Sequence, residues 1–371
     1  MKKESRRQFF HSCFYLGLAG FSSTLIPFFT GWRQEANSIS LPGSLENEHK
    51  ERHRVAVKKK TGPDFEPAYL KLHRSGELAR IREELWSIMR SCELCPRMCG
   101  AGRLDGDEGF CQASAQLEIS AYHPHFGEER SLVGNKGSGT IFLTNCGLRC
   151  VFCINWDISQ GRKGSRNSIE DMAAMMLKLQ KMGCHNINFV TPTHYTPHIV
   201  AAVDKAAGKG LRLPIVYNSC GWERPEILKK LDGIIDIYLP DFKYFDCDMA
   251  AKYSSDAETY PEITRAALLE MHRQVGTAKP AEDGLMYRGL MIRHLVMPNR
   301  VSGTKKVIEW IAENLPKDTY LNIMSQYRPM YKAFEYSEIS RKITREEYSE
   351  AIRWAKEAGL TNLDIQGWFF W

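Results

Sequence analysis

The sequence predicts an α/β fold, a partial (β/α)6 TIM-like barrel that follows a cysteine-rich metal-binding module. Two observations carry this prediction. Beyond Gly137, short β-rich runs alternate with stretches of helical period, a pattern typical of parallel strands joined by helical crossovers. Seven of the eleven cysteines fall between Cys92 and Cys153, in a chain far too large to need disulfide staples, and this clustering indicates metal.

The expected elements follow from hydrophobic period. Leu78, Ile81, Leu85 and Ile88 recur at helical steps and predict a helix over 76–90. Strands are expected at 140–144, 186–191, 214–218, 236–239, 290–297 and 320–325. Helices are expected at 168–182, 197–207, 225–231, 261–275, 304–314 and 344–357. Because six strand–helix units are too few for an eight-unit barrel, we expect an open or partial barrel with its site at the strand carboxyl ends.

Composition excludes several classes of protein. The 371 residues carry 50 Lys and Arg against 44 Asp and Glu, a formal net charge of +6, and 43% are hydrophobic. These are ordinary globular values, which exclude disorder, collagen and coiled coil. The mild charge predicts no nucleic acid as a partner. No P-loop, dinucleotide fingerprint, nucleophile elbow or H-E-x-x-H motif occurs in context, so phosphoryl transfer, hydride transfer and metalloprotease chemistry have no sequence support.

The organisation along the chain predicts four segments. A cationic start runs into an apolar stretch at 14–29, and Ser5-Arg6-Arg7 with the residues after it resembles a twin-arginine export signal. Residues 1–32 are therefore interpreted as a twin-arginine-like signal or membrane anchor, the alternative being a membrane-leaning tail that is never cut. The remaining segments are a polar linker at 33–62, an N-terminal module at 63–136, and a core with a C-terminal helix and aromatic tail at 137–371.

The strongest chemical pattern is a three-cysteine loop directly after the first core strand. Cys146, Cys150 and Cys153 are spaced x3 and x2. Three thiolates on a four-iron cube leave one iron open to a substrate, whereas an electron-transfer cluster normally takes four. A zinc site with three protein ligands is the alternative, but zinc signatures usually show paired C-x2-C knuckles. The spacing therefore favours an iron–sulfur cluster.

The upstream group offers four thiols, the number for a closed site. Its members are Cys92, Cys95, Cys99 and Cys111. The tight triple spacing and the Cys95-Pro96 pair favour an auxiliary [4Fe–4S] cluster. The x2 opening and the Gly-rich surroundings also suit a structural Zn²⁺ site, and both metals stay open. The isolated Cys184, Cys220 and Cys247 are expected to be buried small hydrophobes.

The residues around the three-cysteine loop resemble the radical S-adenosylmethionine enzymes. The loop matches their C-x3-C-x-aromatic-C signature, with Phe152 at the aromatic position. The resemblance implies a barrel of the radical S-adenosylmethionine type, a catalytic [4Fe–4S] cluster and S-adenosyl-L-methionine. It also implies an enzyme that reductively cleaves S-adenosylmethionine to a 5′-deoxyadenosyl radical, which abstracts hydrogen.

A closer resemblance covers roughly Cys92 to Gln366 and is to an uncharacterised subgroup related to pyruvate formate-lyase activating enzymes. The segments that carry it are 92–99, 109–111, 137–140, 186–194, 216–218, 236–244 and 292–295. It implies an activating-enzyme-like oxidoreductase whose substrate is a glycyl-radical protein and whose electron donor is flavodoxin- or ferredoxin-like.

The same resemblance implies residues that bind the cosubstrate. Asp241 and Lys243 match the Asp-x-Lys that contacts the ribose in activases. Arg293 matches their arginine near the methionyl end, and Asn218 sits where they carry a polar residue. The alternative for Asp241 and Lys243 is an ordinary ion pair.

One expected motif is missing. The Gly-Gly-Glu that meets the amino group in activases is replaced by residues 190–194, so Thr191, Thr193 or backbone carbonyls are the candidate substitutes. His194 is a candidate for proton transfer, with a satisfied pocket histidine as the alternative.

Other functions stay open at this point. Radical modification of another peptide or a small molecule is the enzymatic alternative, and an iron–sulfur electron-transfer or binding protein is the non-enzymatic one. The polar stretch 244–259 forms either a lid or a surface loop. The aromatic tail at 367–371 either closes the core or docks a partner. For localisation, the leader favours export or anchoring, whereas S-adenosylmethionine and strong reductants favour the cytoplasm.

Overall fold

The computed structural model describes residues 65–366, which belong to one compact unit. The signal or anchor expected at 1–32, the linker at 33–62 and the aromatic tail at 367–371 lie outside these residues. None of the helices within 65–366 combines the length and the apolar character that a membrane span needs.

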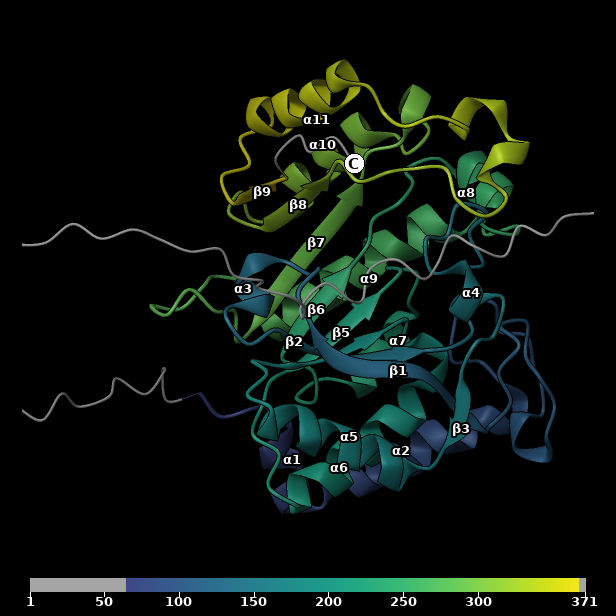
Figure 1. The fold of residues 1–371 in the computed structure, drawn as a ribbon, viewed down its shortest axis with the longest axis vertical. Helices are drawn as coiled ribbons and strands as arrows, with labels where there is room; N and C mark the ends of the chain where they lie inside the picture. The colour runs from purple at the N-terminus through teal and green to yellow at the C-terminus, as the bar shows by residue number, and fades with distance from the viewer. Residues whose placement is uncertain (1–64, 367–371) are drawn as a thin grey trace, which may run out of the picture. The chain divides into compact units, whose positions relative to one another are not determined.

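A nine-stranded mixed sheet forms the centre of the unit, in the order β3-β1-β2-β4-β5-β6-β7-β8-β9 (Figure 1). Its parallel strands are β2 (Ser138–Leu143), β4 (Ile187–Val190), β5 (Ile215–Ser219), β6 (Ile237–Pro240), β7 (Gly289–Leu295), β8 (Tyr320–Met324) and β9 (Leu363–Ile365). The six expected strands are confirmed as β2 and β4 to β8. The mixed α/β class is confirmed too.

The crossovers are helices, as the periodicity predicts. They are α5 (Ile169–Lys181), α6 (Thr196–Gly208), α7 (Pro225–Lys230), α9 (Tyr260–Val275), α10 (Thr304–Asn314) and α11 (Arg345–Glu357). Capping boxes begin two of them, with Ser168 and Asp171 at α5 and Thr344 and Glu347 at α11. Figure 1 shows α5 and α6 at one end of the sheet and α10 and α11 at the other, beside β8 and β9.

The sequence patterns missed the antiparallel edge of the sheet. β1 (Leu117–His125) pairs with β2, and β3 (Ser165–Asn167) pairs with β1, both antiparallel. Leu117 and Ile119 are buried and alternate with half-buried residues, so a period-2 pattern was present at the start of β1. Short helices were missed as well: α3 (Arg130–Val133), α4 (Trp156–Ser159) and α8 (Cys247–Tyr253).

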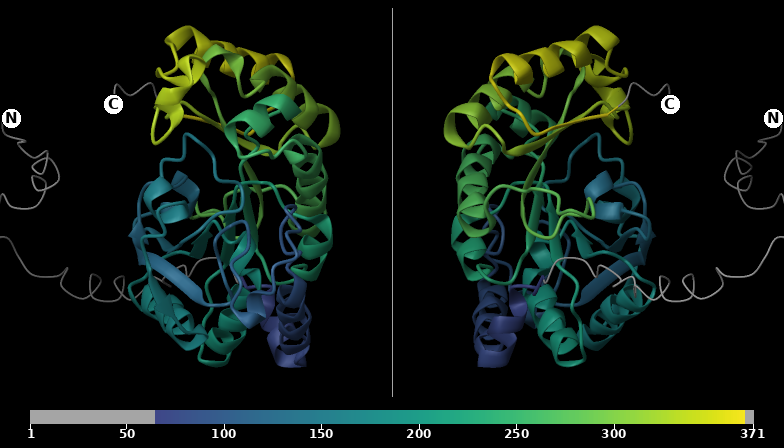
Figure 2. Two further views of the ribbon diagram at one scale, coloured as in Figure 1. Left: turned by 90° about the vertical axis from the view of Figure 1, so that its right-hand side faces the viewer. Right: turned by 90° about the vertical axis from the view of Figure 1, so that its left-hand side faces the viewer.

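The chain enters this fold through two helices, α1 (Tyr69–Ser75) and α2 (Glu77–Ser87). The helix expected over 76–90 is α2 followed by a short 3-10 turn, Ile88–Ser91. Leu78 and Leu85 are fully buried and α2 packs on α6. Figure 2 shows these first helices (purple) at the opposite end of the unit from α11 (yellow).

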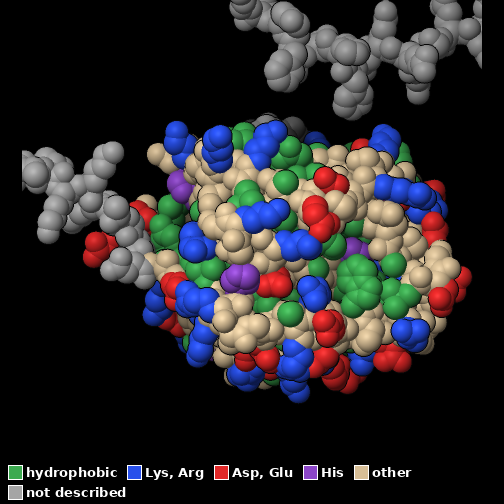
Figure 3. Space-filling view, turned by 90° about the horizontal axis from the view of Figure 1, so that it is seen from below, with side chains coloured by type: hydrophobic (Ala, Val, Ile, Leu, Met, Phe, Trp, Pro, Cys, Tyr) green, Lys and Arg blue, Asp and Glu red, His purple; other side chains and the backbone are tan. Residues whose placement is uncertain are grey.

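The face of the molecule drawn in Figure 3 carries charges of both signs. On the face that Figure 3 shows, Lys and Arg side chains are interspersed with Asp and Glu.

Candidate functional site

A cavity of about 490 Å³ lies at the carboxyl ends of the parallel strands. Residues in or just after each of β2 and β4 to β8 line it, so the six core strands all contribute. This is the edge at which strand–helix folds collect side chains from distant parts of the chain. The expected location of the site is therefore where the structure has its large cavity.

The three-cysteine loop borders this cavity. Cys146, Cys150 and Cys153 all line it, and each of Cys150 and Cys153 also accepts or shares a hydrogen bond at sulfur. Ser254 Oγ donates to Cys150 Sγ at 3.1 Å, and Ser159 Oγ lies 3.3 Å from Cys153 Sγ. Such bonds orient the sulfurs and tune the potential of a cluster that they ligate.

The polar stretch at 244–259 anchors this loop. It forms α8, whose Tyr253 carbonyl accepts from the Val151 amide at 2.9 Å, and Ser254 follows with its bond to Cys150. Tyr253 and Ser254 are fully buried, and no residue of 244–259 lines the cavity. The segment is therefore neither a lid over the cavity nor a plain surface loop.

The donor set fits a cluster with an open iron. Burial raises the pKa of Cys150 to about 12, and the neighbouring Cys146 and Cys153 add to the rise, so a positive charge is needed to hold these thiolates together. Within residues 65–366, no three His, Cys, Asp or Glu side chains lie close enough to hold one metal ion. A cube does not require that, because each thiolate binds a different iron.

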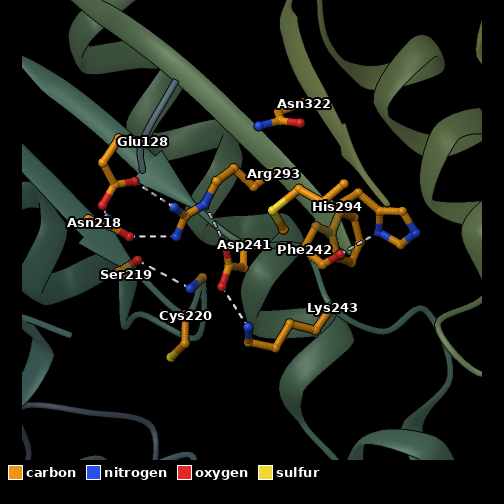
Figure 4. A network of polar contacts seen from close by, with 12 residues as sticks. Glu128, Asn218, Ser219, Cys220, Asp241, Phe242, Lys243, Arg293, His294 and Asn322 are labelled. Carbon is orange, nitrogen blue, oxygen red and sulfur yellow. Dashed lines mark hydrogen bonds and ion pairs between the residues drawn. The ribbon is translucent and has the colours of Figure 1, made fainter. Parts of the chain in front are cut away.

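A network of polar side chains, drawn in Figure 4, lines the same cavity as the cysteine loop. Arg293 is at its centre. Its Nε donates to Asp241 Oδ1 at 2.8 Å, its Nη2 to Asn218 Oδ1 at 2.5 Å, and its Nη1 to Glu128 Oε2 at 3.3 Å. Lys243 Nζ donates to the other oxygen of Asp241 at 2.5 Å. The structure thus brings together the four polar residues that the sequence singled out, with Glu128 as a fifth.

Burial and charge together set the protonation of this network. Burial alone would raise the pKa of Asp241, but Arg293 and Lys243 hold it below its ordinary value. The pKa of Lys243 and that of Arg293 are raised, since attraction to Asp241 outweighs desolvation of their charges. Burial raises the pKa of Glu128 against the opposing pull of Arg293. Asp241 is therefore a carboxylate that faces two cations.

A glycine lets two strand ends approach. Gly221 follows β5 with φ +81°, and a Cβ built on it would lie 1.9 Å from the carbonyl oxygen of Asp241. Any other residue would push the loop after β5 away from the end of β6. Of the three isolated cysteines expected to be buried, only Cys184 is buried. Cys220, just before Gly221, is half-buried and lines the cavity, and Cys247 is exposed on α8, so the expectation was wrong for these two.

Sequence reasoning missed Glu128 and its neighbour Glu129. Both follow β1, an unpredicted strand, and Glu129 accepts a bond from Asn322 Nδ2 at 2.9 Å. Their pKa values are raised by burial. No spacing pattern marks them, because two consecutive glutamates are common on protein surfaces.

The remaining candidates separate by position. Phe152 lines the cavity, and its ring centroid is 5.9 Å from that of Tyr327, which lines it too. Thr191 also lines it, with φ +61°. Thr193 does not, since its hydroxyl donates to buried Glu223 at 2.6 Å.

His194 lies away from the cavity. It is 2% exposed, and its Nε2 is 2.8 Å from the Thr144 carbonyl. Burial lowers the pKa of His194 to about 3, so its ring is neutral. This placement disfavours the proton-transfer role, although the ring is only half satisfied, because its buried Nδ1 has no hydrogen-bond partner among the described residues.

The four upstream cysteines form a separate cluster beside the loop. A Cβ built on Gly109 would lie 3.3 Å from Cys99 Sγ and 3.5 Å from Cys111 Sγ. Both thiols therefore pack against the same glycine. Burial raises the pKa of Cys111 to about 11, with Cys92 and Cys99 adding to the rise. Cys92 and Cys111 are buried, whereas Cys99 is exposed.

A family model, one relative and one solved structure are similar to this chain. The model of the radical SAM superfamily matches residues 140–276. A protein of Methanocaldococcus jannaschii described as uncharacterized is 32% identical over 327 residues, covering 86% of this chain and 89% of its own. A crystal structure of a radical SAM methyltransferase from Sphaerobacter thermophilus is similar with TM-score 0.41 and 12% identity. That match covers 61% of this chain and 65% of the methyltransferase, less than two thirds of its length.

Proposed function

Because the chain belongs to the radical SAM superfamily, we propose that it reductively cleaves S-adenosylmethionine at the cavity between the cysteine loop and Arg293. One observation carries the proposal: the three cysteines and the network around Arg293 line the same cavity. Membership implies an enzyme with a [4Fe–4S] cluster. We further propose that the curved sheet is a partial (β/α)6 barrel, with its site at the open carboxyl edge.

The chain's own residues would bind and orient the cosubstrate. Cys146, Cys150 and Cys153 would ligate three irons. When bound, the cluster supplies an electron that cleaves the sulfonium C–S bond, and the 5′-deoxyadenosyl radical so formed abstracts hydrogen. Asp241 would accept hydrogen bonds from the ribose, and the guanidinium of Arg293 would attract the methionyl carboxylate.

Asp241 and Lys243 can bind the cosubstrate only if the ion pair between them partly opens. Asp241 and Lys243 are 13% and 15% exposed at their side chains, and each bonds the other. Cosubstrate binding would exchange one of these bonds for one to ribose or carboxylate, at little net cost in hydrogen bonds. The remaining contact to Arg293 would keep Asp241 ionised.

For the substrate, we propose an activase-like role, hydrogen abstraction from a glycyl-radical protein. The support is the motif resemblance and the rim of the cavity. Ile154 lines the cavity and is 54% exposed, and Trp156 nearby in the chain is 36% exposed. Apolar side chains at a mouth suit a protein loop that inserts its backbone Cα–H.

Electron paramagnetic resonance tests the role directly. Reduced protein and S-adenosylmethionine are incubated with candidate glycyl-radical enzymes, and a glycyl radical is expected on one of them. If 5′-deoxyadenosine accumulates without a glycyl radical on any candidate, the activase role is lost and radical modification of another peptide or a small molecule replaces it. If no 5′-deoxyadenosine forms, the chain is an iron–sulfur electron carrier or binding protein instead.

A further inference from the structure

The upstream cysteines lie directly against the cysteine loop of the cavity. A Cβ placed on Gly147, the residue after Cys146, would lie 3.5 Å from Cys95 Sγ and 4.0 Å from Cys111 Cβ. Only backbone therefore separates a thiol of the upstream set from the loop that carries the catalytic thiols. Every cysteine of one set is at least 35 residues from every cysteine of the other, yet the two sets lie side by side.

Arg97 lies between the two cysteine sets and contacts residues next to each. Its Nε donates to the Gly147 carbonyl at 3.1 Å, and its Nη2 donates to the Ser254 carbonyl at 3.0 Å. Ser254 is the residue whose hydroxyl bonds Cys150. The guanidinium also lies 4.1 Å from the ring centroid of Phe110, which precedes Cys111. Arg97 thus contacts residues that adjoin both cysteine sets.

The environment of the upstream thiols suits a charged metal cluster. Arg103 is 0% exposed, donates twice to the Ser114 carbonyl, and places Nη1 3.7 Å from Cys92 Sγ. A buried guanidinium beside a thiol compensates a net negative thiolate cluster and raises its reduction potential. A structural zinc site would not benefit from this guanidinium in the same way, because Zn²⁺ has no redox chemistry and hence no reduction potential to adjust.

The upstream set also reaches the surface. Cys99 is exposed, and so are its neighbours Met98, at 54%, and Phe110, at 38%. The catalytic thiols Cys150 and Cys153 are enclosed by comparison, with Cys150 8% exposed. A protein donor can therefore approach the upstream set more closely than the loop at the cavity.

Resting on the proposed function, we infer that Cys92, Cys95, Cys99 and Cys111 hold a second [4Fe–4S] cluster that relays electrons to the cavity. A low-potential donor of the flavodoxin or ferredoxin class reduces it from the 2+ to the 1+ state. It returns to 2+ when that one electron passes to the cluster at Cys146, Cys150 and Cys153. The donor is the species oxidised, and the sulfonium C–S bond is the final acceptor.

Metal analysis and spectroscopy test the site without reference to activity. The full chain is reconstituted without oxygen, and about eight irons and no zinc per chain are expected. Two reduced clusters this close should broaden each other's electron paramagnetic resonance signals. In the triple variant Cys146→Ala, Cys150→Ala and Cys153→Ala, about four irons and one unbroadened signal should remain. Four irons with one zinc in the unmodified chain, or two independent signals, would overturn the inference.

The relay itself is tested by comparing two reductants. Cleavage of S-adenosylmethionine is measured with reduced flavodoxin and with dithionite, a small reductant that can reach the cavity directly. In Cys95→Ala the ratio of flavodoxin-driven to dithionite-driven cleavage should fall at least about tenfold, roughly 1.4 kcal/mol in barrier. Cys99→Ala, at an exposed position, repeats the test should Cys95→Ala unfold the module. An unchanged ratio in both variants would refute the relay.

A matched control and the wild type separate the two proposals. Cys247→Ala removes an exposed thiol outside both sets and should keep the iron content, the broadened signal and the ratio. If the unmodified chain cleaves nothing even with dithionite, the proposed function fails. Iron content and signal broadening then still decide whether a second, adjacent cluster exists.

Discussion

The guanidinium of Arg293 donates to the carboxylate of Asp241 across two neighbouring strands, with 2.8 Å between Nε and Oδ1. The same two residues form an isolated parallel bridge where β6 ends. Backbone pairing and side-chain pairing therefore coincide, and the position of Asp241 depends on a strand 52 residues away. Both side chains are largely shielded from water, so removal of either weakens the network beside the cavity, where only Lys243 would still form an ion pair with Asp241 and only Glu128 with Arg293.

The first prediction concerns this pair. Arg293→Lys keeps the charge but cannot reach Asp241, Asn218 and Glu128 together, because an ammonium lacks the planar fork. Affinity for S-adenosylmethionine should fall about 10- to 100-fold, the loss of one or two charge-assisted hydrogen bonds. Calorimetry on protein with an oxidised cluster measures it. Arg300→Lys, in an exposed pair with Glu350, is the control. Equal affinity in both variants would remove Arg293 from the binding site.

The second prediction concerns the cysteine loop. Alanine at any one of Cys146, Cys150 and Cys153 should abolish 5′-deoxyadenosine formation and the absorbance of that cluster, while the upstream metal is retained. The strand–helix core does not depend on the cluster, so circular dichroism should be unchanged. Chromatography of the nucleoside product and metal analysis check the two claims. Cleavage that persists in all three variants contradicts the assignment of this loop.

The third prediction concerns the Ser254 hydroxyl, which donates a hydrogen bond to the Cys150 sulfur. Ser254→Ala removes a donor at 3.1 Å from the sulfur, so the cluster should become harder to reduce. The expected drop in midpoint potential is tens of millivolts, since about 1 kcal/mol equals roughly 40 mV for one electron. Redox titration followed by electron paramagnetic resonance measures it. Ser255→Ala is matched, because that hydroxyl donates to the Arg149 carbonyl and not to sulfur. A shift of equal size in both would show that packing, not the bond, is responsible.

The fourth prediction concerns pH. Glu223 is 1% exposed, and burial raises its pKa from 4.5 to about 8, although Thr193 and Tyr217 donate to it. Between these values the folded state keeps a proton that the unfolded state has lost, so this contribution to the unfolding free energy is full below pH 4.5 and falls toward pH 8. In Glu223→Gln the unfolding free energy should fall less steeply between pH 4.5 and pH 8, and the difference from wild type over this range should be a few kcal/mol at most, by order of magnitude.

Urea unfolding from pH 5 to pH 8 compares this variant with wild type. Glu226→Gln is the control, since that side chain is 64% exposed on α7. The same pH slope in wild type and Glu223→Gln would mean that Glu223 ionises normally in the folded chain.

Local patterns along the chain were enough to predict the six parallel strands, their helices and the cysteine loop. Each depends on local pattern: a helical period such as that of Leu78, Ile81 and Leu85, or a spacing of three thiols within one loop. The location of the site also followed, because parallel strands end at one edge of the sheet. Asp241, Lys243, Arg293 and Asn218 were marked by motif resemblance and lie together in the structure.

The distant groups that complete the site could be found only from the packing of the folded chain. Glu128 reaches Arg293 over 165 positions in the chain, and Cys95 lies against Gly147 through the packing of the N-terminal module on the core. His194, next to a predicted strand end, turned out to face Thr144 and not the cavity. Such contacts depend on how elements pack against one another, and no local period or spacing encodes that packing.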